Sequence, residues 1–156
     1  MKKSEVRYHR QIVVRLLFIL YCGVMLWLLF GQRMEGTKIS ISLGLSGENL
    51  NLVPFETVRL YWRLLQRGST EELLRHAIIN LVGNVVVFVP FGWFLPYIWQ
   101  KMRSFLKTAL TAALSICLVE ICQYVTGLGS CDIDDLILNL AGVMLGYLVW
   151  KLFKGK

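Results

Sequence analysis

Charged residues are scarce in this chain of 156 residues, of which only 17% are Asp, Glu, Lys or Arg and 56% are apolar. An average soluble domain has about 25% charged and about 45–50% apolar residues. A soluble fold of this length would leave large apolar patches in contact with water. The shortage of charge therefore excludes an ordinary soluble domain and a disordered chain, and it indicates a small integral membrane protein.

Cysteine and histidine are also few, with four and two residues in the whole chain. Cys22, Cys117 and Cys122 lie in apolar stretches, where a small apolar side chain is the expected role. Cys131 falls between two such stretches, and no CxxC pair is present. The sequence thus has neither a disulfide framework nor the ligand spacing of a zinc site.

Four apolar stretches are each long enough to cross a bilayer as a helix, which takes about 20 residues. They cover residues 11–31, 77–99, 106–126 and 133–153. The first follows a basic segment, as a signal peptide would, but no small-x-small cleavage site closes it and its apolar run continues beyond such a core. We therefore predict a single all-α membrane domain over residues 1–156, with four transmembrane helices and a long loop over residues 32–76.

Positive charges are concentrated on one side of the predicted membrane domain. Lys and Arg gather in the N-terminal segment, in the short loop after residue 99 and at the C-terminus, whereas all acids except Glu5 fall on the other side. Short loops rich in Lys and Arg stay in the cytoplasm, so both termini are predicted to be cytoplasmic and residues 32–76 external. The net charge of +7 is then a topology signal. Basic residues dispersed over membrane flanks do not indicate a nucleic-acid partner.

The external loop contains the pattern of an amphipathic helix after residue 54. Phe55, Val58, Leu65 and either Tyr61 or Trp62 share one face. The opposite stripe is basic and consists of Arg59, Arg63 and Arg67. A helix of this kind lies in the membrane interface and contacts anionic headgroups. A solvated cationic face on a helix packed against the protein is the alternative, and the sequence leaves both open.

Local signals also predict where the elements around this helix begin and end. Residues 36–52 are rich in Ser, Gly and Asn and are expected to be irregular. Residues 69–72 form a capping box, which predicts that the second transmembrane helix begins at Thr70. Pro90 and Pro96 are expected to kink or end that helix.

Polar side chains inside the apolar stretches gather at one depth, near the predicted outer end of three different helices. They are His76, Asn80, Asn84, Glu120, Gln123, Asp132, Asp134, Asp135 and Asn139. Ionisable groups are costly in a membrane and usually face the bundle interior or a wet cavity. Inverting the protein would move the whole group together, so the convergence does not depend on the orientation. We predict that these residues form one binding site.

Simpler roles remain open for some of them. Asn80 and Asn84 can be interhelical hydrogen-bonding residues, and His76 can lie at the level of the lipid headgroups. Glu120 is harder to explain in this way, because a carboxylate in the membrane needs a partner, a metal ion or a proton.

The start of the fourth helix also allows a structural reading. Asp134 or Asp135 is expected to cap this helix, and Asp132 is expected to lie solvated in the loop. Further along the helix, Gly142 and Gly146 form a GxxxG step on roughly the face of the polar residues. A close helix contact at these glycines would close the site from below.

The order of these motifs resembles the VanZ family. The matching segments are residues 51–55, 84–92, 120–123 and 132–142, which together extend over most of the chain. The resemblance implies a multi-pass protein of the bacterial cytoplasmic membrane that gives resistance to the glycopeptide antibiotic teicoplanin, without the vancomycin-type change of peptidoglycan precursor. The residues that match the family's recurrent polar positions are Asn84, Glu120, Gln123, Asp132, Asp134, Asp135 and Asn139.

Two classes of function follow from the polar group and the resemblance. The first is a binding or shielding protein whose outer site holds a membrane lipid or a lipid-linked cell-wall precursor, or counters a teicoplanin-type glycopeptide at the membrane. The second is an intramembrane enzyme, in which Glu120 and Asp135 act as general acid and base or Asp132, Asp134 and Asp135 hold a divalent cation. No nucleophile lies beside a base in the sequence, so we favour the binder and leave catalysis open. Assembly as an oligomer is compatible with both.

Overall fold

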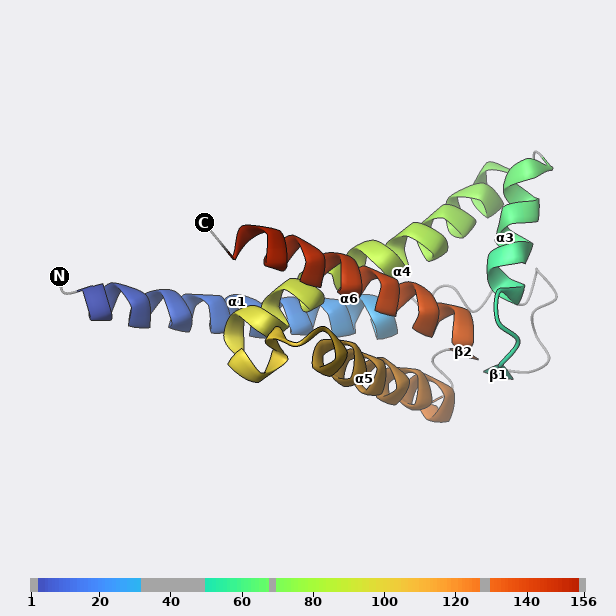
Figure 1. The fold of residues 1–156 in the computed structure, drawn as a ribbon. Coiled ribbons are helices and arrows are strands. Elements are labelled where there is room, and N and C mark those ends of the chain that lie inside the picture. Colours follow the sequence, from blue (N-terminus) through green and yellow to red (C-terminus); the bar gives the residue numbers. More distant parts are fainter. Residues whose placement is uncertain (1–2, 32–49, 68–69, 127–129, 155–156) are drawn as a thin grey trace.

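The computed structural model describes residues 3–31, 50–67, 70–126 and 130–154. Within these ranges four helices are long and apolar enough to cross a membrane. They are α1 (Lys3–Gly31), α4 (Glu71–Ile98), α5 (Phe105–Thr126) and α6 (Ile133–Phe153). The predicted all-α fold with four transmembrane helices is therefore confirmed. The N- and C-terminal ends of the chain lie at the same end of the bundle (Figure 1).

Four short elements connect or cover these helices. The amphipathic helix is α3 (Glu56–Gln66), which lies across the end of the bundle opposite both chain termini (Figure 1). A 3-10 turn, η1 (Gln100–Arg103), joins α4 to α5. Strand β1 (Leu50–Asn51) pairs in parallel with β2 (Cys131–Asp132). The expectation of irregular structure is thus wrong for Leu50–Asn51, and residues 36–49 lie outside the described ranges.

Helix α4 begins at Glu71, one residue after the predicted start, and continues through Pro90 and Pro96. Thr70 is the N-cap residue, although its side chain makes no capping hydrogen bond, and residue 69 of the predicted capping box is not among the described residues. Pro90 lies within the helix, which ends two residues after Pro96. A proline leaves a carbonyl of the preceding turn without its helical partner, and neighbouring helices in a membrane can supply one. Pro90 leaves the Val86 carbonyl without its N–H donor, and one residue further along the helix the Tyr21 hydroxyl of α1 donates a hydrogen bond to the Val87 carbonyl, at 2.6 Å.

The closest helix contact is between α4 and α6, whose backbones touch at glycines. A Cβ atom on Gly142 would overlap the Val85 carbonyl, and one on Gly146 would overlap the Val89 carbonyl. Gly92 of α4 packs in the same way against the backbone of α6. The predicted close approach at the GxxxG step is confirmed. Small residues allow this contact because association within a bilayer depends on van der Waals packing between helices.

This contact predicts the effect of single methyl groups on stability. Gly146→Ala places a Cβ against the Val89 carbonyl, so α4 and α6 must separate. We expect the free energy of unfolding to fall by about 1–3 kcal/mol, the usual cost of overpacking. Gly83→Ala is the matched control on α4, because the nearest atom to its Cβ is Ile79 Cγ2 at 3.9 Å. Thermal unfolding in detergent measures both variants, and equal melting temperatures would contradict the proposed role of the glycine contact.

Candidate functional site

Three aspartates at the start of α6, one at the N-cap and two in the first turn, are almost completely buried. Asp132, Asp134 and Asp135 have 8%, 0% and 3% of their surface exposed. The expectation that Asp132 is solvated in the loop is therefore wrong. The Asp134 backbone N–H donates a hydrogen bond of 2.8 Å to Asp132 Oδ1, so the capping residue of α6 is Asp132 rather than Asp134 or Asp135.

Asp132 also connects α6 to the segment that leads into α3. The Thr57 hydroxyl donates to Asp132 Oδ2 at 2.6 Å, and Asn51 Nδ2 donates to Asp132 Oδ1 at 3.3 Å. Asn51 and Asp132 are register partners in the β1–β2 pair. Asn51 Oδ1 in turn accepts from the Val53 backbone N–H at 3.1 Å, which forms the turn before α3. Asn51 and Thr57 were missed as polar partners by the sequence analysis, although Asn51 lies in the first motif of the family resemblance.

Asp134 caps the N-terminus of α3 from another part of the chain. Its two carboxylate oxygens accept hydrogen bonds from the backbone N–H groups of Phe55 and Val58, the latter at 3.0 Å. A carboxylate is favourable there because the free amides and the helix dipole make a helix N-terminus positive. Phe55 has a left-handed backbone with φ of 65°, which costs roughly 1–2 kcal/mol in a residue with a side chain. Charged hydrogen bonds are each worth about 1.5–3 kcal/mol and outweigh this cost.

Asp135 and Glu120 bring two further helices to the same turn. Asn84 Nδ2 of α4 donates a hydrogen bond to Asp135 Oδ1. Glu120 of α5 accepts from the Asp132 backbone N–H at 3.3 Å. Glu120 is 4% exposed, so both carboxylates are removed from solvent. We call Asn84, Glu120 and Asp135 the polar triad; it joins α4, α5 and α6.

Two of the other predicted site residues, Gln123 and His76, face helices that do not belong to the triad. Gln123 faces α1, since its Nε2 atom donates to the Leu29 carbonyl at 2.8 Å. The ring of His76 lies 6.3 Å from the ring of Tyr61 on α3, centroid to centroid. Within the described residues, four buried polar side-chain atoms have no hydrogen-bond partner: His76 Nδ1, Asn80 Oδ1, Gln123 Oε1 and Asn139 Oδ1.

The three aspartates do not form the metal site that we considered. Among the residues with described positions, no group of three or more His, Cys, Asp or Glu side chains is arranged to hold a metal ion. Asp132 and Asp134 instead use their carboxylate oxygens to accept hydrogen bonds from β1 and α3. In this arrangement the two carboxylates are engaged as hydrogen-bond acceptors.

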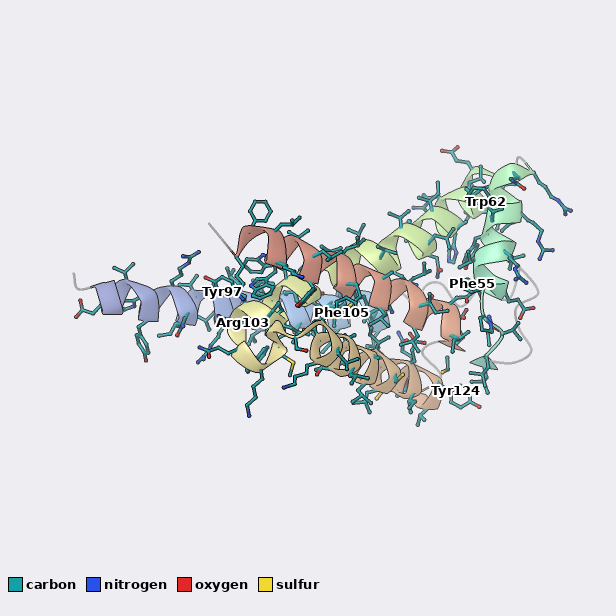
Figure 2. All side chains as sticks on the ribbon, viewed as in Figure 1. Phe55, Trp62, Tyr97, Arg103, Phe105 and Tyr124 are labelled. Atoms are coloured by element: carbon teal, nitrogen blue, oxygen red, sulfur yellow. The ribbon has the colours of Figure 1, made fainter. Side chains whose placement is uncertain are left out.

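The basic stripe of α3 lies on the outer side of that helix. Arg59, Arg63 and Arg67 are exposed, and Trp62 borders their stripe with 59% of its surface accessible. Tyr61 is only 4% exposed and packs inward, so it is Tyr61 that completes the apolar face. Figure 2 labels Trp62 and Phe55 on this helix, at the end of the bundle away from Tyr97 and Arg103.

Cys131 is the cysteine nearest to the carboxylates. Burial raises the pKa of its thiol, and the charges of Glu120, Cys117 and Asp132 raise it further. A raised pKa keeps the thiol protonated at neutral pH, and the thiolate is the reactive form. The position next to the triad therefore does not activate Cys131 as a nucleophile.

Comparison with known proteins gives two matches. The model of the VanZ/LLP1 family matches residues 18–154. A relative called Protein VanZ, from Enterococcus faecium, is 28% identical over 142 residues, which cover 91% of this chain and 76% of that protein. No solved structure matches significantly. The matched region contains the polar triad and the three aspartates.

The cap on α3 predicts a local effect of Asp134→Asn. An amide side chain keeps one acceptor oxygen, so one of the two backbone N–H groups loses its partner. At about 1.5 kcal/mol or more for a charged hydrogen bond, exchange of the Phe55 and Val58 amides should accelerate by about tenfold or more. Hydrogen exchange followed by mass spectrometry measures this. Glu56→Gln, at an exposed position in the first turn of the same helix, is the control and should accelerate exchange by less than about fivefold, because an exposed acid there contributes only about 0.3–1 kcal/mol. Unaltered exchange in Asp134→Asn would show that Asp134 does not hold α3.

The environment of Cys131 predicts its alkylation behaviour. A variant with Cys22, Cys117 and Cys122 replaced by Ala leaves Cys131 as the target of iodoacetamide. The pH profile of its alkylation rate should lie at higher pH in the folded chain than in the unfolded chain, because burial raises the pKa of the Cys131 thiol. Adding Glu120→Gln should move the profile back toward lower pH, since a charge that raises this pKa is removed. Identical profiles for the folded and unfolded chains would contradict this environment.

Proposed function

Because the chain belongs to the VanZ/LLP1 family, we propose that it counters teicoplanin at the bacterial cytoplasmic membrane by binding an envelope lipid or lipid-linked cell-wall precursor at the polar triad. The family match and the VanZ relative support a teicoplanin-resistance-type protein. Four apolar helices with this family match make it a multi-pass bacterial membrane protein. The binding site and its ligand are the part that we add.

The observation that carries the proposal is that buried polar side chains of two other transmembrane helices bond to the start of α6, Asn84 to Asp135 and Glu120 to the Asp132 backbone N–H. Asp132 and Asp134 have a structural role, because their hydrogen bonds fix β1 and α3 to the start of α6. Asp135 instead pairs with a side chain of another transmembrane helix. The bundle does not require a buried polar pair for packing, since replacing both partners of such a pair by apolar residues is often neutral or stabilising. Ionisable side chains buried in a membrane bundle usually belong to a functional site, which supports ligand binding near Glu120 and Asp135.

The atoms available near the triad indicate the chemistry of the ligand. Carboxylate oxygens accept hydrogen bonds, and so do the partnerless Oδ1 atoms of Asn80 and Asn139 on the same two helices as Asn84 and Asp135. A buried acceptor without a partner costs about 1–3 kcal/mol, which a ligand with donor groups would recover. Hydroxyl, amide N–H and ammonium groups satisfy this requirement. They are the groups that the sugar, peptide and amine heads of envelope lipids carry.

A site in the membrane also fits selectivity between glycopeptides. Teicoplanin carries an acyl chain that anchors it in the bilayer, and vancomycin does not. A protein that occupies or shields a lipid headgroup at the membrane surface therefore interferes with the anchored antibiotic more than with the soluble one.

The proposal predicts the antibiotic susceptibility of bacteria that express the chain. Wild type should lower susceptibility to teicoplanin several-fold and leave that to vancomycin unchanged. Glu120→Gln and Asp135→Asn replace a carboxyl group by an amide of similar size and should abolish this protection at matched membrane levels. Glu71→Gln, at an exposed position in the first turn of α4, is the control and should protect like wild type.

Two results would contradict different parts of the proposal, the binding site and the resistance phenotype. If Glu120→Gln and Asp135→Asn protect as well as wild type, the triad is structural and the binding site lies elsewhere. If wild type itself gives no protection, the resistance phenotype does not extend to this chain.

A further inference from the structure

The outer face of α3 combines cations with a large exposed aromatic side chain. Arg59, Arg63 and Arg67 follow one another at four-residue spacing, and Trp62 lies three residues after Arg59, so the tryptophan borders the basic stripe. All four are exposed. The opposite face packs inward through Tyr61. Apolar packing therefore uses one side of α3, and the basic side is left for another partner.

Among the described residues, the guanidinium groups on this face have no carboxylate partner. In the part of the chain with described positions, none of the three arginines forms an ion pair with a carboxylate, and Arg63 donates only to the Arg59 backbone carbonyl, at 3.3 Å. Glu56, the one acid of α3, lies in its first turn, and the rest of the helix carries only basic charge. An arginine offers a planar set of donors that matches the oxygens of a phosphate.

The fold holds this face at the level where the transmembrane helices end. Asp134 caps α3 through Phe55 and Val58, and Thr57 is bonded to Asp132, so the helix is fixed to the first turn of α6. In Figure 1, α3 lies crosswise over the ends of α4 and α6. Side chains that end in nitrogen project from α3 away from the bundle in Figure 2. Lipid phosphates lie at this level of a bilayer, and tryptophan is enriched there.

We propose that the face of α3 formed by Arg59, Trp62, Arg63 and Arg67 binds the phosphate groups of anionic phospholipids at the membrane surface. The arginines contact the phosphates, and the Trp62 ring lies among the headgroups beside them. The attraction of basic residues to anionic lipids corresponds to roughly fivefold in affinity for each charge. This surface is separate from the polar triad, and its lipid is recognised by net negative charge rather than by hydrogen-bond donors.

Native mass spectrometry of the full chain in detergent tests the proposal, with equimolar phosphatidylglycerol and phosphatidylcholine as probes. Wild type should retain phosphatidylglycerol in preference to phosphatidylcholine. Arg59→Gln/Arg63→Gln/Arg67→Gln should lower this preference by about tenfold or more. The matched control, Lys101→Gln/Arg103→Gln/Lys107→Gln, removes three exposed cations at the other end of the bundle. It should keep the preference within about twofold of wild type, because the contact is local to α3.

A folding control and a single variant accompany the triple α3 variant. Thermal unfolding without added lipid shows whether the triple α3 variant is folded, and if it is not, Arg63→Gln alone should lower the preference by roughly fivefold. Equal losses in the α3 and control variants would mean that overall charge retains the lipid, and an undiminished preference in the α3 variant would place the lipid elsewhere. Either result overturns the proposal. Neither bears on teicoplanin protection by the triad.

Discussion

The start of α6 holds together the end of the molecule at which the polar side chains gather. Its three aspartate carboxylates and one backbone N–H bond to four other segments: β1, α3, α4 and α5. Asp132 bonds to Asn51 of β1 and to Thr57 of α3, while Asp134 caps the N-terminus of α3. Asp135 pairs with α4, and the Asp132 backbone N–H bonds to Glu120 of α5. Buried charges are tolerated when donors surround them, and here the donors come from the segments that must be held together.

Glycine packing and the position of α3 are linked through the same helices. The backbones of α4 and α6 touch at Gly142 and Gly146, and the two helices then separate toward α3 (Figure 1). Asn84, one residue before the Val85 contact with Gly142, lies where the separation starts, and its hydrogen bond to Asp135 joins the helices again. Helix α3 covers the separated ends and is held by Asp134. The close contact lower in the bundle and the polar contacts above it therefore fix the geometry of the triad together.

The sequence predicts the four transmembrane helices, the amphipathic α3 and the glycine contact, because each depends on a regular spacing along one segment. The sequence does not predict as well which residues from different segments contact each other. Asp134 bonds to backbone amides, which every residue has, so nothing in the sequence marks Phe55 and Val58 as its partners. The β1–β2 pair has only two residues in each strand, too few for an alternating pattern to show. Asp132 was expected to be solvated because its local sequence resembles a loop, but distant donors from Asn51 and Thr57 bury it.

The coupling between Asn84 and Asp135 is the most direct test of this account, because this hydrogen bond joins the two helices on which the proposed site depends. A double-mutant cycle with Asn84→Ala, Asp135→Ala and the double variant gives their interaction energy from the free energy of unfolding in detergent. The account predicts a coupling within the range of about 0.5–3 kcal/mol that contacting residues show. Additive effects of the two substitutions would contradict it, because α4 and α6 would then not be joined at the triad.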